Sequence, residues 1–101
     1  MSIHVVIVTF IFKSEDGKRK VLEILKSSDG LEKTKTFKGF ISIDINESNT
    51  DEKKLVFFQK WETQSDHDNY LEYRKTTGLF NSVMELLAIP FTIDRYTLVD
   101  F

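Results

Sequence analysis

The sequence has no cysteine, one proline and four glycines, and only two of its 101 residues are histidine. The lack of cysteine excludes disulfides, thiolate nucleophiles and cysteine-based metal sites. It also agrees with a reducing compartment, and we predict a cytoplasmic protein. Two histidines are too few for a histidine-rich metal site.

Long hydrophobic runs and an excess of basic charge are also missing. The charge-free N-terminal stretch has 12 residues, which is too short to span a bilayer, and no basic segment precedes it as in a signal peptide. We therefore interpret it as a strand and expect no membrane partner. The net charge of −2 argues against a nucleic-acid partner, because binding to phosphates needs a clustered basic excess.

Four segments of the chain have the hydrophobic pattern of strands. Residues 3–12 and 54–62 are apolar at both alternating positions, which is typical of strands buried on both faces. Residues 40–46 alternate between apolar and polar, which predicts a half-exposed strand with its isoleucines (Ile41, Ile43 and Ile45) on one side. Residues 93–99 form a last strand that carries several polar side chains.

Between these strands, apolar residues recur at helical spacing. A polar residue that can cap the first turn precedes two of the segments, with Asp16 as the candidate for the first helix. The expected helices cover residues 18–27, a short turn at 31–36, a segment that begins after a cap at Thr63 or Ser65 and ends at Gly78, and residues 79–88.

The element order is therefore β-α-β-β-α-α-β, and residues 1–101 fit a single α+β domain. Right-handed crossovers convert this order into a ferredoxin-like fold with a four-stranded antiparallel sheet in the order 4-1-3-2. This topology places the two doubly apolar strands at the centre of the sheet. Helices can cover only one sheet face, so the other face would leave apolar side chains exposed. We predict that a second copy covers it, in a homodimer formed through the sheet face.

The most reactive set of side chains lies on the third helix. His67, Tyr70 and Arg74 share one face by their spacing, and Gln59 and Trp61 point inward from the preceding strand. These residues would line a pocket for a small organic ligand, in which the arginine binds an anion and the histidine or tyrosine moves a proton. In the alternative interpretation Tyr70 belongs to the core, and His67 and Arg74 are solvated flanks.

Two other kinds of site find less support. A mixed metal site around His67 would need Glu62, Asp66 or Asp68, whose spacings put them on different helix faces, so we expect no metal. RNA-recognition domains share the predicted topology, but the segment 54–61 lacks the glycine of their strand signature and the chain is acidic.

Several short motifs between Phe37 and Tyr96 resemble the antibiotic biosynthesis monooxygenase family of the dimeric α+β barrel superfamily. A glycine motif precedes the second strand, the third strand ends in an acidic tryptophan motif, and an aromatic residue follows on the next helix. A proline precedes the last strand. The matching residues are Phe37-Lys38-Gly39-Phe40, Gln59-Lys60-Trp61-Glu62, Tyr70-Leu71-Glu72-Tyr73-Arg74, Gly78 and Pro90.

The resemblance implies a homodimer with a ligand cavity in each subunit, and a cofactor-independent monooxygenase that oxidises small phenols or hydroquinones to quinones. Trp61 matches the pocket tryptophan of the family. Tyr70 stands where many members have a histidine, for which His67 would substitute one turn earlier, and Gln59 replaces the usual glutamate. Leu71 stands at the histidine position of the haem-degrading branch, so no haem is expected. The alternative is a non-catalytic dimeric module that binds a small molecule or acts in stress.

Overall fold

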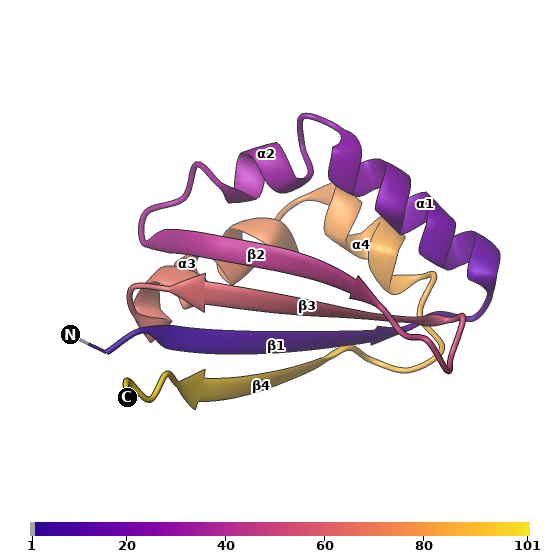
Figure 1. The fold of residues 1–101 in the computed structure, drawn as a ribbon. Helices are drawn as coiled ribbons and strands as arrows, with labels where there is room; N and C mark the ends of the chain where they lie inside the picture. Colours follow the sequence, from indigo (N-terminus) through magenta and orange to yellow (C-terminus); the bar gives the residue numbers. More distant parts are fainter. Residues whose placement is uncertain (1) are drawn as a thin grey trace.

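The computed structural model describes residues 2–101, which form four strands and four helices in one α+β unit (Figure 1). The strands are β1 (His4–Ile11), β2 (Phe40–Glu47), β3 (Lys54–Trp61) and β4 (Thr92–Thr97). The helices are α1 (Glu15–Lys26), α2 (Leu31–Thr34), α3 (Gln64–Lys75) and α4 (Gly78–Met84).

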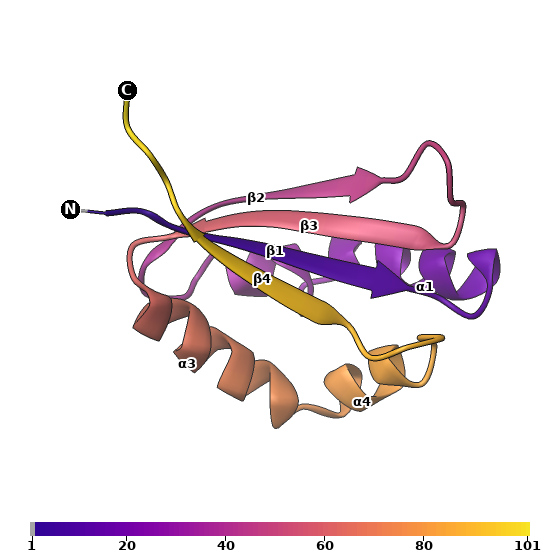
Figure 2. The same cartoon turned by 90° about the horizontal axis from the view of Figure 1, so that it is seen from below.

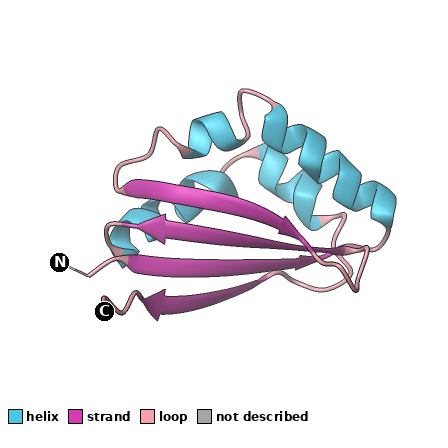
Figure 3. Ribbon diagram, viewed as in Figure 1, coloured by secondary structure: helices cyan, strands magenta, loops and turns pink. Residues whose placement is uncertain are grey.

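The sheet has the order β2-β3-β1-β4 and every neighbouring pair is antiparallel. This is the predicted order 4-1-3-2 read from the other edge, so the ferredoxin-like topology is confirmed. The helices form a second layer on one face of the sheet (Figures 2 and 3). No helix of residues 2–101 lies over the opposite face, as the count of crossover connections predicted.

The two faces of the central strands differ in burial. On the helix side, Val6, Leu55 and Trp61 are fully buried. On the other side, Phe58 of β3 is 48% exposed, and Tyr96 of the neighbouring edge strand β4 is 53% exposed. The central strands are therefore apolar on both sides, but one chain buries only one of them.

Side-chain caps fix where the long helices begin. Ser14 caps α1, because its Oγ accepts a hydrogen bond from the backbone N–H of Gly17 at 3.1 Å. The prediction of Asp16 as the cap is wrong, since this residue already lies inside the first turn. Thr63 caps α3, and its Oγ1 accepts from the N–H of Asp66 at 3.1 Å, which settles the choice left open in the sequence.

A β-bulge at the start of β2 breaks the predicted alternation of isoleucines. The pairing of β2 with β3 shifts register between Phe40 and Ser42, so Ile41 becomes 42% exposed instead of facing the helices. The aromatic ring of Phe40 points inward in its place and packs edge-on against Trp61 at 5.5 Å. The prediction therefore fails for Ile41, because the extra residue of the bulge changes which side chains face the core.

Candidate functional site

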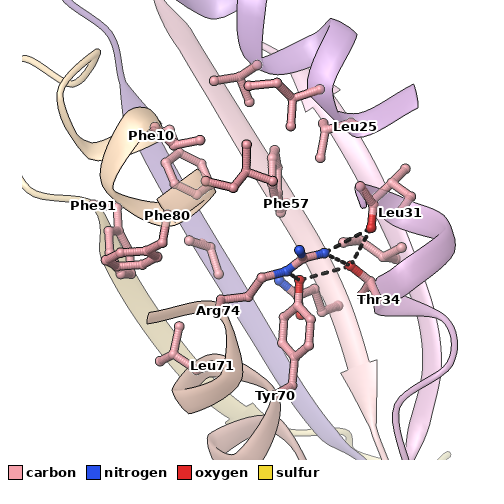
Figure 4. Close-up of a pocket in the computed structure, with 18 of the residues that line it drawn as sticks. Phe10, Leu25, Leu31, Thr34, Phe57, Tyr70, Leu71, Arg74, Phe80 and Phe91 are labelled. Atoms are coloured by element: carbon pink, nitrogen blue, oxygen red, sulfur yellow. Dashed lines mark hydrogen bonds between the residues drawn. The ribbon is translucent and has the colours of Figure 1, made fainter. Parts of the chain in front are cut away.

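A cavity of about 130 Å³ lies between the helices and the sheet (Figure 4). Its walls come from β1, β2, β3, β4 and from all four helices, and most of its lining side chains are apolar. An apolar cavity of about 150 Å³ in another protein holds benzene, so this volume suits a single aromatic ring.

Phenylalanine side chains form one end of the cavity. Phe10 packs against Phe57 with ring centroids 4.8 Å apart and against Phe91 at 5.7 Å. Phe80 of α4 meets Phe91 edge-on at 6.0 Å. The rings come from two strands, a helix and the segment just before β4, and a flat aromatic ligand would make edge and face contacts with them.

Arg74 connects α3 to the start of α2 at another part of the cavity wall (Figure 4). Its Nε donates a hydrogen bond to the hydroxyl of Tyr70 at 2.9 Å, and its Nη2 donates to Oγ1 of Thr34 at 3.0 Å. The two terminal nitrogens also donate to the backbone carbonyls of Asp29 at 2.8 Å and Gly30 at 2.9 Å. Four of the donors that a guanidinium carries are thus used inside the protein.

These contacts also determine the hydrogen bonds of Tyr70. Its oxygen accepts from Arg74, so the hydroxyl hydrogen is directed to Oγ1 of Thr34 at 2.9 Å. Thr34 in turn donates to the carbonyl of Gly30 at 3.3 Å. Tyr70 therefore lines the cavity with its ring, while its hydroxyl is bonded to neighbouring protein groups.

His67 is 1% exposed and lines the cavity. Its Nδ1 lies 3.2 Å from Nη1 of Arg95, a residue of β4. Arginine has only donors, so Nδ1 is the acceptor and the single proton of the neutral imidazole is on Nε2. The alternative that His67 is a solvated flank is therefore wrong.

The pKa of His67 is lowered to about 4. Burial is the largest cause, and the positive charge of Arg95 adds to it, while the carboxylate of Asp68 acts in the opposite direction. His67 is thus neutral at pH 7 and a weak base. The predicted role as proton acceptor fits this arrangement less well than a role as hydrogen-bond donor through Nε2.

The amide of Gln59 has a defined orientation. Nε1 of Trp61 donates to its Oε1 at 2.9 Å, and because an indole nitrogen can only donate, the amide oxygen must face Trp61. The amide nitrogen then carries two hydrogens, and no acceptor among residues 2–101 bonds to it. Gln59 lines the cavity and is 4% exposed.

Four of the five predicted site residues line the cavity, namely Gln59, His67, Tyr70 and Arg74. Trp61 does not; it is fully buried behind them and packs against the rings of His67 at 5.6 Å and Tyr70 at 5.2 Å. The structure thus brings the predicted set together, with Trp61 as its support.

Sequence reasoning missed Thr34 and Arg95. Thr34 lies in a four-residue helix whose pattern gave no sign of a site. Arg95 had a detectable signal, because it occupies a position of β4 that pairs with the buried Val6, and a charged residue on the helix side needs a partner.

Within residues 2–101, no group of three or more histidine, aspartate or glutamate side chains is placed to hold a metal ion. None of the helices in the same range is long and apolar enough to cross a membrane.

No protein-family model matches the chain, and no curated protein matches it. Solved structures do match it. A monooxygenase from Streptomyces coelicolor in complex with nanaomycin D has a TM-score of 0.74 and is 20% identical, over 97% of this chain and 88% of that one. A candidate antibiotic biosynthesis monooxygenase from Nitrosomonas europaea has a TM-score of 0.70 and 18% identity, over 93% and 88% of the two chains. The chain has the fold of these monooxygenases.

Other solved structures share this fold. The Mycobacterium tuberculosis protein Rv0793 is 25% identical over 99% of this chain and 98% of its own, with a TM-score of 0.69. A protein from an uncultured marine organism, described as dimeric and ferredoxin-like, has a TM-score of 0.77 and 15% identity, over 100% of this chain and 99% of that one. The ferredoxin-like fold predicted from the order of strands and helices is confirmed.

Proposed function

We propose that this protein is a cofactor-independent monooxygenase that oxidises a phenol or hydroquinone with a single ring to a quinone. The fold is that of monooxygenases, and the cavity of about 130 Å³ matches one aromatic ring. The apolar walls exclude water from the bound ring, which protects reactive intermediates.

The observation that carries the proposal is a pair of N–H donors on two side chains that line the cavity. The Nε2–H of His67 and the amide nitrogen of Gln59 have no acceptor among residues 2–101, and both side chains line the cavity. Donors held in an apolar site stabilise oxygen atoms that carry negative charge. A phenolate oxygen, which becomes a carbonyl oxygen in the quinone, accepts such bonds throughout the reaction.

In the proposed reaction the electrons come from the substrate. The phenol loses its proton to water and binds as the phenolate, which reduces dioxygen. With a phenol, one oxygen atom forms a new bond to a ring carbon and becomes the second quinone oxygen, and the O–O bond breaks. With a hydroquinone, the inserted atom becomes the hydroxyl oxygen of a hydroxyquinone. The other oxygen atom takes up two protons, equivalent to those lost from the phenolic oxygen and the ring carbon, and leaves as water, so phenol and dioxygen give quinone and water in a four-electron oxidation. The protein binds the anion and excludes water, and no residue needs to accept an electron.

The proposed active form is a homodimer that pairs the open sheet faces. This face presents Val5, Ile7, Val56, Phe58 and Tyr96, with the last two about half exposed. Exposed apolar side chains grouped in this way are typical of an interface. Similar structures are described as dimeric. Sedimentation at micromolar concentration tests this; a species of 11.8 kDa would contradict it.

A second candidate function is a module that binds a small molecule without converting it. Its support is that the hydroxyl of Tyr70 is bonded to Thr34 and Arg74, and that His67 is a weak base, so neither is free to take a proton from a substrate. Such a cavity would bind a ring with an acceptor oxygen without converting it.

Oxygen uptake with a panel of single-ring phenols and hydroquinones separates the two functions. The monooxygenase consumes oxygen and loses at least 90% of its rate in Gln59→Leu and His67→Phe, because each removes a donor to the anion. Gln64→Leu, an exposed position of α3, is the matched control and keeps the rate. Saturable binding without oxygen uptake supports the binding module instead.

A further inference from the structure

Arg95 of β4 joins three side chains from two other elements, and it does so behind the cavity wall. Its Nη1 lies 3.0 Å from Nε2 of His4 in β1 and 3.2 Å from Nδ1 of His67 in α3. Its Nη2 donates to Oδ1 of Asp68 at 3.0 Å. Arg95 is not among the side chains that line the cavity, so it reaches a bound molecule only through His67.

The donor pattern of a guanidinium fixes the protons of both imidazoles. Nη1 carries two hydrogens and cannot accept, so each imidazole nitrogen that faces it must be unprotonated. His4 therefore accepts through Nε2 and His67 accepts through Nδ1. The proton of His67 is then held on Nε2. Asp68 accepts from the second terminal nitrogen and holds the plane of the guanidinium in this position.

We propose that Arg95 is a positioning residue that locks His67 in the Nε2–H tautomer, so that the cavity offers a hydrogen-bond donor and admits only ligands with an acceptor oxygen at that place. The identity of the ligand atom, a phenolate or quinone oxygen, rests on the proposed function. The tautomer of His67 is independent of that function, because it follows from the contacts of the ligand-free protein.

Burial and the charges around His67 make the lock stable over a wide pH range. Burial is the largest cause that disfavours a second proton on His67, and Arg95 from β4 and His4 from β1 act in the same direction, whereas Asp68 on α3 favours that proton. Arg74 lines the same cavity and is also positive. His67 thus stays a neutral donor down to a pH of about 4, the value to which its pKa is lowered.

Nitrogen-15 NMR of the full-length protein without ligand tests the proposal directly. At pH 7 the wild type should show a protonated Nε2 and an unprotonated Nδ1 for His67, with no titration above pH 5. In Arg95→Met the two tautomers should mix and the pKa of His67 should rise, since the positive charge beside the imidazole is lost while the carboxylate of Asp68 remains. Arg19→Met, an exposed arginine on α1, is the matched control and should leave both signals unchanged.

Two results would overturn the proposal. One is a wild-type His67 protonated on Nδ1 at pH 7, which needs no variant and so holds even if Arg95→Met does not fold. The other is an Arg95→Met protein with the tautomer and titration of the wild type. Arg95→Lys keeps the charge without the two-pronged geometry, and should keep a low pKa while the tautomers mix.

Failure of the proposed function can be distinguished from failure of the positioning role of Arg95. If His67 shows the predicted tautomer in the wild type and loses it in Arg95→Met, but no phenol drives oxygen uptake, the positioning role stands and the monooxygenase fails. If oxygen uptake occurs, Arg95→Met should lower kcat at least tenfold and shift the acidic limb of the pH profile upward. A purely structural role would lower the melting temperature without moving that limb.

Discussion

Replacing Arg74 with methionine separates two roles that this residue could have in the cavity. The sequence suggested that Arg74 binds an anionic substrate, but in the structure its guanidinium is bonded to Tyr70, Thr34 and the carbonyls of Asp29 and Gly30. Methionine keeps most of the aliphatic stem and loses all four hydrogen bonds. We therefore expect the main effect on stability rather than on the charge of the site.

The size of the effect follows from the burial of the partners. The bond to Asp29 is exposed, so water replaces it at little cost, whereas the bonds to Tyr70, Gly30 and Thr34 are partly buried. Each of these three contributes about 1 kcal/mol, which gives a loss of about 3 kcal/mol in the free energy of unfolding. In a domain of this size that loss lowers the melting temperature by at least about 12 °C.

Thermal unfolding followed by circular dichroism measures this loss. Arg19→Met is the matched control, because that arginine makes only an exposed ion pair with Glu15 on one helix, and it should leave the melting temperature unchanged. Arg74→Lys adds the decisive comparison, since lysine keeps the charge but cannot make the forked contacts. A fully stable Arg74→Met protein, or a lysine variant with the wild-type melting temperature, would contradict a stabilising role for these hydrogen bonds.

Three further changes have clear expected outcomes. Gly39→Ala should lower the free energy of unfolding, measured with a chemical denaturant, by at least about 2 kcal/mol, because Gly39 has a φ of 82° and an added Cβ would meet the carboxylate of Asp66. Gly78→Ala is the control and should be neutral or slightly stabilising, because nothing lies within 4 Å of a Cβ added there. Trp61→Phe should cost about 3 kcal/mol, since it leaves Oε1 of Gln59 without its donor and removes fully buried volume. The free energy of unfolding should fall by at most about 3 kcal/mol as the pH is lowered from 6.5 to 4, because His67 binds a proton in the unfolded chain but not in the folded one, where its pKa is lowered to about 4. His67→Gln should remove the part of this pH dependence that comes from His67. Equal pH dependences in the two proteins would contradict this.

The fold was predictable because the central and edge strands differ in their hydrophobic pattern. Right-handed crossovers gave the order of strands, and the hydrophobic pattern agreed with it, since β1 and β3 are doubly apolar and central while β2 and β4 have polar positions and are edges. The bulge at Ile41 was not predictable, because the residues around it alternate as in a regular strand. It arises from the tertiary pairing of β2 with β3.

The candidate site was predictable only in part. Helical spacing placed His67, Tyr70 and Arg74 on one face of α3, and that placement is what brings them to the cavity. The spacing did not identify their hydrogen-bond partners. Thr34 and Arg95 are 36 and 28 residues away from the side chains they bond, and these contacts decide which atoms donate and which accept.

Isotope labelling of the product tests the proposed oxidation most directly. The purified wild-type protein is incubated with a single-ring phenol under ¹⁸O₂, without added metal or cofactor, and the quinone is analysed by mass spectrometry. We predict one ¹⁸O atom in each quinone molecule and the other in water, with a rate that falls at least tenfold in Gln59→Leu. A protein that binds the phenol and yields no labelled quinone with any member of the panel would contradict it.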